Sequence, residues 1–314
     1  MSPTSEAQVG PDLSLAAFEQ LFAEVKNWGR WGPDDDHGAL NYITPERTRA
    51  AAALVRFGQT VSLAARLDTA AGPDNPRPVL HFMTGLAEAS GDEPRFAADF
   101  MGIECHGDAH SHIDALNHCV FRGELYNGIP ASSITSGGGP RGAITVATHG
   151  IVSRGVLLDV PRLRSVRWLE PGEIVTAEDL EAAEQAQSVR LGEGDILLVR
   201  TGHARRRLEL GPWEAATAKA GLHPHAMRLL HARGIAAAGF DGDGDAIPHH
   251  VEGISYPIHC LGINAMGLHF MDSLDLEDVA TACDAHQQWE FLCVIAPLRL
   301  SGGTGTAVNP IAIF

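Results

Sequence analysis

The second half of the chain alternates short apolar runs with amphipathic segments, and this alternation limits the fold more than any other feature. Strand-like runs cover residues 143–147, 155–160, 195–200, 235–240 and 291–296. Helical patterns lie among them, at residues 176–187, 223–233 and 276–285. Strands and helices of this length that follow one another predict an α/β architecture.

The first half of the chain adds further predicted helices and strands to this α/β architecture. Residues 13–28 carry apolar side chains at helical spacing and predict an amphipathic N-terminal helix. Thr44 and Pro45 are typical of the cap and first position of a second helix, which continues to Phe57. Strand signals follow at residues 60–65 and 78–83. Residues 1–13 predict a flexible leader, and the rest, 14–314, a single domain with a helical N-terminal extension, because no linker, repeat or charge run divides it.

Composition excludes several classes of protein. The chain has 314 residues, of which 45% are hydrophobic and 20% charged, as in ordinary globular proteins. The net charge of −16 argues against nucleic-acid binding. The apolar runs are too short to span a membrane, and the N-terminus lacks a secretory signal pattern. Five cysteines without a CxxC pair argue against a disulfide scaffold, so we expect a reducing, cytoplasmic location.

A cluster of histidines and aspartates carries the chemistry. Residues 106–118 contain four of the 16 histidines. The ionisable residues that share even-numbered positions are His106, Asp108, His110, His112 and Asp114. On a β-strand these side chains would all project from one face, while their small or apolar neighbours pack against the sheet. Imidazole and carboxylate groups together suit a divalent ion such as Zn²⁺ or Mn²⁺.

Three other interpretations of this cluster stay open. A helix would also align His106, His110, Asp114 and His118 at a spacing of four, although Gly107 disfavours a helix before Ile113. A strand to Ile113 followed by a helical turn would bring His118 back over Asp114. The histidines could also be solvated or satisfied by ordinary hydrogen bonds, but six ionisable groups in phase make this alternative weaker.

The segment SHIDALNH, residues 111–118, resembles a family motif. The motif is His-x-Gly-Thr-His-x-Asp-x-x-x-His, and the family is the cyclase-like metal-dependent hydrolases, which include bacterial kynurenine formamidase and isatin hydrolase. Further segments resemble its longer members, at residues 31–41, 123–128, 198–203, 289–298 and 302–305. The resemblance covers nearly the whole chain beyond residue 27. It implies the swivelling β/β/α cyclase-like fold around a mixed β-sheet core.

The resemblance also implies roles for individual residues. His112 and Asp114 match metal ligands, and His118 matches the catalytic base. At the first ligand position the sequence departs from the motif, so either Asp108 replaces the histidine or His106 is its counterpart across two extra residues. The family's downstream histidine and acidic residue have counterparts in a second region: His259, taken as catalytic, and Asp272, taken as a metal ligand. The short aspartate at 272 favours one ion over two.

These residues predict a metal-dependent hydrolase. A divalent ion lowers the pKa of bound water and polarises a carbonyl group, and a neutral histidine can move the proton. The expected reaction opens an amide, lactam or lactone bond of a small molecule. Two alternatives are a metal-dependent cyclase or dehydratase of secondary metabolism and a non-catalytic protein that binds metal or a small ligand. The resemblance also implies a homodimer or homotetramer.

Weaker signals remain. The aromatic residues Trp31 and Tyr126 are candidates for substrate binding, although such residues also anchor loops or form turns. The aspartates of residues 241–245, with Glu252, resemble a calcium-binding loop. Ala246 stands where that loop requires glycine, and Pro248 interrupts it. We therefore expect a turn beside the active site.

Overall fold

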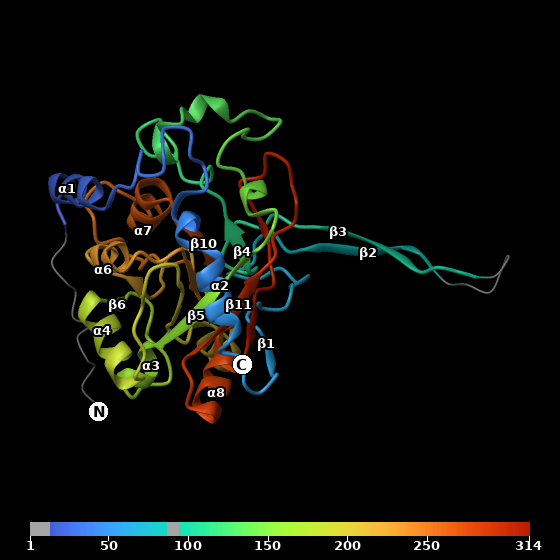
Figure 1. Ribbon diagram of the computed structural model, residues 1–314. Coiled ribbons are helices and arrows are strands. Elements are labelled where there is room, and N and C mark those ends of the chain that lie inside the picture. Colours follow the sequence, from blue (N-terminus) through green and yellow to red (C-terminus); the bar gives the residue numbers. More distant parts are fainter. Residues whose placement is uncertain (1–12, 87–93) are drawn as a thin grey trace.

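The computed structural model describes residues 13–86 and 94–314. Its main feature is a nine-stranded sheet, shown in Figure 1. The strands, in their order across the sheet, are β1 (Thr60–Ser62), β13 (Ile311–Ile313), β11 (Glu290–Ile295), β5 (Ile151–Asp159), β7 (Ile196–Arg200), β9 (Ala237–Phe240), β10 (His269–Asp272), β4 (His112–Asp114) and β12 (Gly305–Ala307). A separate two-stranded sheet pairs β6 (Ile174–Val175) with β8 (Gly221–Leu222).

The large sheet is mixed. Its four central strands, β5, β7, β9 and β10, pair in parallel, and antiparallel strands extend it on both sides. All five residues of β7 are buried, as expected for a central parallel strand covered on both faces. The expected α/β class with a mixed sheet is therefore confirmed.

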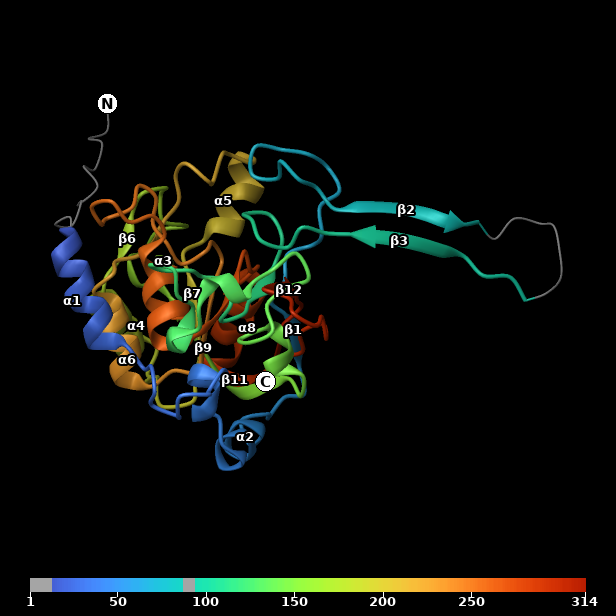
Figure 2. The same cartoon turned by 90° about the horizontal axis from the view of Figure 1, so that it is seen from above.

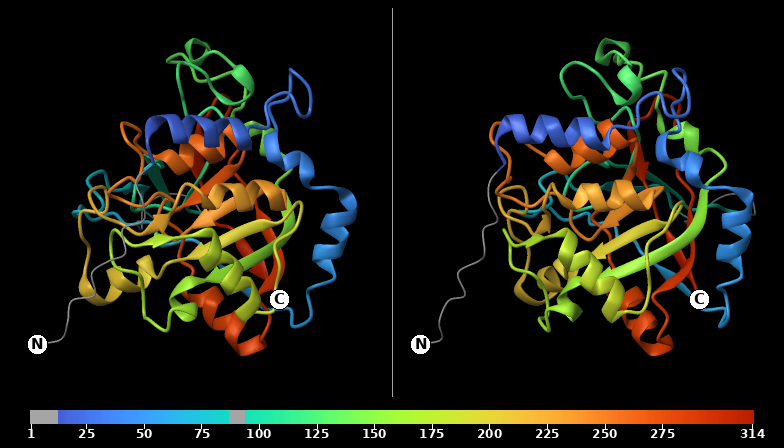
Figure 3. Two further views of the ribbon diagram at one scale, coloured as in Figure 1. Left: turned by 90° about the vertical axis from the view of Figure 1, so that its left-hand side faces the viewer. Right: turned by 60° about the vertical axis from the view of Figure 1, so that its left-hand side comes forward.

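Helices cover the sheet and create two apolar cores. The α-helices are α1 (Leu15–Val25), α2 (Pro45–Ala52), α3 (Val160–Leu163), α4 (Ala177–Ala186), α5 (His203–Leu210), α6 (Ala226–Arg233), α7 (Pro257–His259) and α8 (Glu277–His286). One core joins a sheet face to α1, α4 and α6, which lie on the same side of the molecule (Figures 1 and 3). The other lies between the opposite face and α8, and includes Phe291, Val279 and Phe314.

Most predicted elements are found, because their local signals are strong. Helix α4 begins with a full capping box, in which Thr176 Oγ1 accepts from the Asp179 N–H (3.2 Å) and Asp179 Oδ2 from the Thr176 N–H (2.9 Å). The strand predicted at 143–147 is wrong. Gly142, with φ of 62°, turns the chain there, and residues Ile144–Ala147 form a 3₁₀ helix.

The N-terminal leader falls almost wholly outside the described residues. Of the range 1–13, only Leu13 is described, and it is buried. Its N–H donates to the carbonyl oxygen of His250 (2.8 Å), which fixes the chain just before α1. No helix in the described ranges is both long and apolar enough to cross a lipid bilayer.

A two-stranded arm projects far from the rest of the molecule (Figures 1 and 2). It pairs β2 (Leu80–Gly85) with β3 (Ala98–Gly102) in antiparallel register. Its apolar side chains are largely exposed, and Phe82 stacks on Phe100 with ring centroids 5.0 Å apart. The exposed fraction reaches 61% at Leu80 and 55% at Phe82. Because β3 leads directly into the loop that carries His106, the arm begins beside the histidine cluster.

Candidate metal centre

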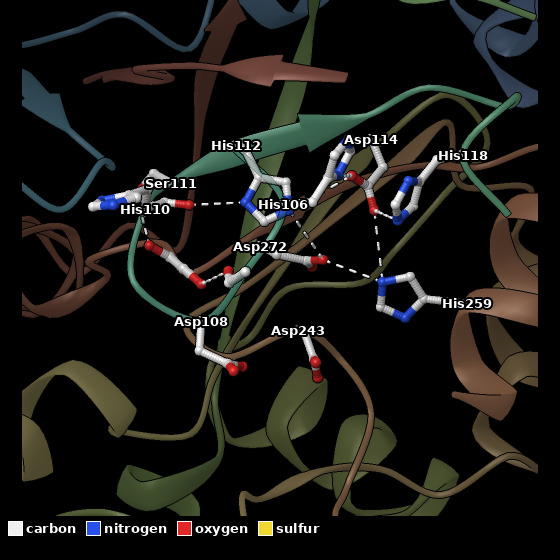
Figure 4. A network of polar contacts seen from close by, with 12 residues as sticks. His106, Asp108, His110, Ser111, His112, Asp114, His118, Asp243, His259 and Asp272 are labelled. Atoms are coloured by element: carbon white, nitrogen blue, oxygen red, sulfur yellow. Dashed lines mark hydrogen bonds and ion pairs between the residues drawn. The ribbon is translucent and has the colours of Figure 1, made fainter. Parts of the chain in front are cut away.

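The histidines and aspartates converge at one end of the central strands, as Figure 4 shows. Asp272 is the last residue of β10, and it lies opposite His112 in the antiparallel pairing of β10 with β4. His112 and Asp114 project from the same face of β4, since they are two residues apart on a strand. His259 enters from α7, and His106 from the loop before β4.

Asp114 is the centre of this group, and it is fully buried. Its Oδ1 lies 2.9 Å from His106 Nδ1 and 3.5 Å from His112 Nε2. Its Oδ2 lies 3.6 Å from His259 Nε2 and 3.7 Å from His118 Nε2. One carboxylate therefore faces four imidazole rings.

Asp272 forms a second point of convergence. Its Oδ2 lies 3.3 Å from His259 Nε2 and 3.9 Å from His112 Nε2. Two overlapping sets of ligand atoms, each within 4.8 Å of one another, result from this arrangement: His106 with His112 and Asp114, and Asp114 with His259 and Asp272. Nitrogen and carboxylate ligands in this combination suit Zn²⁺ or Mn²⁺.

The buried polar atoms of the site show whether its residues suit a bound cation. Both carboxylate oxygens of Asp114, Oδ1 of Asp272 and Nδ1 of His106 are buried, and none makes a hydrogen bond of good geometry with a described residue; the oxygens of Asp114 have only the ion-pair contacts with imidazole nitrogens given above. Such groups are costly to bury without a partner. A divalent ion between them would supply that partner, so the residues fit a bound metal.

Charge at the site is balanced by protons when no metal is bound. Burial lowers the pKa of His106, but contact with Asp114 outweighs burial and raises this pKa to about 10. For His259, burial is again outweighed by Asp114, Asp245 and Asp272, which hold its pKa well above the ordinary value. Burial raises the pKa of Asp272 to about 6 despite its contact with His259. A divalent ion carries the positive charge that these imidazolium protons provide, and its binding would displace them.

His118 differs from the other histidines of the site. Its ring stacks on that of His106, with centroids 3.9 Å apart and planes 6° apart. Burial, with the neighbouring histidines, lowers the pKa of His118 to about 4 although Asp114 opposes this change. The side chain is still 30% exposed and lines the cavity. It is therefore an accessible, unprotonated imidazole at neutral pH.

Further hydrogen bonds fix the orientation of three rings. The Nδ1 atom of His259 lies 2.7 Å from Asp245 Oδ2, and that of His112 lies 2.8 Å from the His110 carbonyl oxygen. The Nε2 atom of His106 lies 3.0 Å from Thr304 Oγ1. Each contact leaves the other ring nitrogen directed at the aspartates, as is typical of metal-binding histidines.

A cavity of about 370 Å³ opens beside these groups. The residues that line it include His106, Asp108, His112, Asp114, His118, Cys119, Val120, Asp243, Ser255, Tyr256, His259, Cys260 and Asp272. Its volume lies in the range of small-molecule sites. Val120 and Tyr256 add an apolar and an aromatic surface beside the polar groups.

The structure brings together six of the residues singled out in the sequence: His106, His112, Asp114, His118, His259 and Asp272. Asp108 lines the same cavity, but its Oδ1 pairs with the ammonium group of Lys219. Of the two alternatives for the first ligand, the structure therefore places His106, and not Asp108, against Asp114. The expected strand over residues 106–111 is also wrong, since β4 begins only at His112.

The two aromatic candidates lie elsewhere. Trp31 packs edge-on against Tyr42, with ring centroids 5.1 Å apart. Tyr126 is fully buried, and its hydroxyl group donates to Asp35 Oδ2 (3.1 Å). Neither side chain is among the described residues that line the cavity. Their contacts are those of residues that fix the loop around residues 28–42.

Sequence reasoning did not identify Lys219, Asp243 or Asp245 as site residues. The available signal was the run of aspartates at 241–245, which directly follows the buried strand β9. Residues at the carboxyl ends of parallel strands commonly form the binding site in open α/β sheets. This run forms the turn beside the cavity that the sequence predicted.

The chain is similar to a known protein family and to several solved structures. Residues 34–244 match the model of a family described as "Putative cyclase". No curated protein matches the chain. Among solved structures, one described as a novel cyclase superposes with a TM-score of 0.85 at 32% identity, covering 93% of this chain and 99% of the other.

Two more distant structures share the fold. An isatin hydrolase bound to the product analogue thioisatinate has a TM-score of 0.58 and 18% identity, covering 87% of this chain and 99% of its own. The structure described as a "predicted metal-dependent hydrolase from Bacillus stearothermophilus" has a TM-score of 0.50 and 17% identity, covering 81% and 97%.

Proposed function

Because the chain belongs to the putative cyclase family, we propose that it is a metal-dependent hydrolase that opens an amide, lactam or lactone bond of a small molecule. The observation that carries this proposal is the position of Asp114, a buried carboxylate that faces four imidazoles and makes no hydrogen bond of good geometry with a described residue. A cavity large enough for a small substrate lies directly beside it.

The residues of the site have two roles in this proposal, metal binding and proton transfer. His106, His112, Asp114, His259 and Asp272 would hold the ion, with Zn²⁺ and Mn²⁺ as the candidates. In this proposal His259 is therefore a ligand, and not the catalytic residue expected from the sequence. When bound, the ion supplies Lewis acidity at the position where a carbonyl oxygen gains charge. His118 accepts a proton from the attacking water through its neutral imidazole, and then delivers it to the leaving nitrogen or oxygen.

The proposal is tested with purified protein and a panel of aryl amides, lactams and lactones. We expect hydrolysis of at least one compound in the presence of Mn²⁺ or Zn²⁺, loss of activity after treatment with a chelator, and recovery when the ion is restored. Activity that persists in protein shown by elemental analysis to be metal-free would contradict the proposal.

A ring-forming reaction is the second candidate, because both the family description and the 32%-identical structure carry the name cyclase. A Lewis acid and a base beside one cavity could also activate a carbonyl compound for ring closure. Metal-loaded protein that hydrolyses none of the panel, but converts an open-chain polycarbonyl compound to a ring, would favour the cyclase. Metal-loaded protein that converts neither would favour a binding role.

For the oligomer, we propose that the arm of β2 and β3 packs against a second copy of this chain. A lone two-stranded hairpin is only marginally stable in water, and this one exposes a row of large apolar side chains. Reciprocal exchange of two identical arms about a two-fold axis closes the assembly and covers both apolar surfaces.

Removing the apolar side chains of the arm should therefore dissociate the oligomer. For the double variant F82S/F100S, we expect light scattering to give a lower molar mass than the wild type, because the stacked pair no longer offers an apolar contact. Leu208→Ser is the matched control, since Leu208 is 85% exposed on α5 and lies outside the arm. A monomeric wild type, or a variant of unchanged mass, would contradict this proposal.

A further inference from the structure

Lysine is rare in this chain and occupies an unusual place. The chain has 23 basic residues of the Lys and Arg types, and only Lys26 and Lys219 are lysines. Lys26 is exposed, whereas Lys219 is one of the largest fully buried side chains, at 1% exposure. Lysine is almost never fully buried unless its charge is paired, so a specific arrangement must hold Lys219 in place.

Two carboxylates hold the buried ammonium group. Lys219 Nζ pairs with Asp108 Oδ1 and with Asp243 Oδ2. We name these three residues the lysine clamp. Burial lowers the pKa of Lys219, but the two carboxylates outweigh burial and keep its pKa above the ordinary value, so the clamp stays charged. The main chain of Lys219 is also fixed, since its carbonyl oxygen accepts from the Ile247 N–H (2.9 Å).

The clamp joins the two loops that flank the metal centre. Asp108 belongs to the loop that carries His106, two residues earlier. Asp243 belongs to the loop that follows β9 and also carries Asp245. Figure 4 shows Asp108 and Asp243 side by side below the cluster, each coming from its own segment of the chain. Both side chains line the cavity of the metal centre.

The second loop in turn holds His259. Asp243 Oδ1 accepts from the Asp245 N–H (3.1 Å), and Asp245 Oδ2 lies 2.7 Å from His259 Nδ1. Asp245 also accepts from the N–H of Ile258 (2.8 Å), at the start of the turn that presents His259. A short chain of contacts therefore connects the ammonium group of Lys219 to a ring that faces Asp114 and Asp272.

We propose that Lys219 is a positioning residue of the metal centre. It touches none of the proposed ligands, but its ammonium group ties the His106 loop to the loop that orients His259, and it thereby sets the distance between these two rings. This inference rests on the proposed function, because the property that it explains is the affinity of the site for a divalent ion. The ammonium group of lysine is a compact point charge with three N–H donors, so Lys219 can pair with both carboxylates at once.

The direction in which Lys219→Met changes the affinity for a divalent ion separates a positioning role from a purely electrostatic effect of the lysine charge. Lys219→Met removes a positive charge near the site, so a field effect alone would make divalent ions bind more tightly. Positioning predicts the opposite. We expect Mn²⁺ to bind K219M about 10- to 100-fold more weakly in isothermal titration calorimetry, the range for residues that support metal ligands from outside. We expect kcat on the active panel compound to fall by a similar factor, with KM changed less than about 3-fold.

A charge-matched variant keeps the test valid if K219M folds poorly. In K219M/D243N, the clamp keeps its net charge of −1, and the one remaining carboxylate, Asp108, has solvent access from the cavity. Positioning predicts that this variant melts near the wild-type temperature and still binds Mn²⁺ about 10- to 100-fold more weakly. Lys26→Met, which alters the only other lysine, should match the wild type in both measurements.

The outcomes distinguish this inference from the proposed function. If K219M or the double variant binds Mn²⁺ as tightly as the wild type, or more tightly, and turns over substrate at the same rate, the positioning role is wrong and the hydrolase proposal stands. If the wild type binds no divalent ion, the proposed function itself fails, and the positioning role fails with it.

Discussion

Asp114→Asn is expected to yield a folded protein that no longer retains a divalent ion. Asp114 is common to both sets of candidate ligands, so its loss disrupts each of them. The amide group of asparagine has nearly the same shape but lacks the negative charge that stabilises the metal and the rings of His106 and His259. Because the altered group is itself a proposed ligand, we expect the affinity for Mn²⁺ or Zn²⁺ to fall by more than the roughly 100-fold seen for supporting residues.

Elemental analysis after dialysis checks this prediction, together with calorimetric titration of the ion. Hydrolytic turnover should fall in proportion to metal content. Asp278→Asn is a suitable control, because Asp278 is an exposed aspartate on α8 outside both ligand sets. Wild-type metal occupancy in the Asp114→Asn protein would show that the ion is held elsewhere.

His118→Ala is expected to separate catalysis from metal binding. His118 belongs to neither set of candidate ligands, and its Nε2 lies 3.7 Å from the nearest oxygen of Asp114. The variant should therefore bind the ion within a few-fold of the wild-type affinity. Turnover should fall by about 10²- to 10⁴-fold, the usual contribution of a general base.

The low pKa of His118 gives the physical reason for this effect. Burial keeps the imidazole unprotonated at neutral pH, which a proton acceptor requires, while its exposed edge reaches the cavity. His286→Ala provides a control, because His286 lies on α8 and stacks on Phe57, with ring centroids 3.9 Å apart. If His118→Ala lost metal and turnover equally, His118 would be a ligand. Unchanged turnover would show that it is not the base.

The core of the site follows from the periodicity of the sequence. The alternation of residues 112–114 places His112 and Asp114 on one face, and the structure shows this on β4. The turn after the strand brings His118 within reach of Asp114, as the compromise between strand and helix predicted. Local geometry decides both features, so a single sequence contains enough information for them.

The strand predicted from the alternation of residues 106–114 is absent where contacts with distant parts of the chain determine the structure. Before His112 the chain lies outside the strand, and the side chain of Asp108 pairs with Lys219, more than a hundred residues later in the sequence. His106 still reaches the site, but from a loop, with its Nε2 beside Thr304. Lys219 acts through partners that only the folded chain brings close, and no spacing in the sequence reveals it, whereas the one signal for Asp245 is its place in the aspartate run at 241–245. The helical and strand signals are local, and they predicted the sheet and its helices far better than they predicted these long-range contacts of the site.

The most direct test of this account is metal analysis of the purified protein combined with a crystallographic anomalous difference map. We expect at least one equivalent of a divalent ion per chain. Its anomalous peak should lie about 2.0–2.3 Å from ligand atoms of Asp114 and of at least two of His106, His112, His259 and Asp272. Protein that takes up no divalent ion, or a peak that lies away from Asp114, would contradict the account.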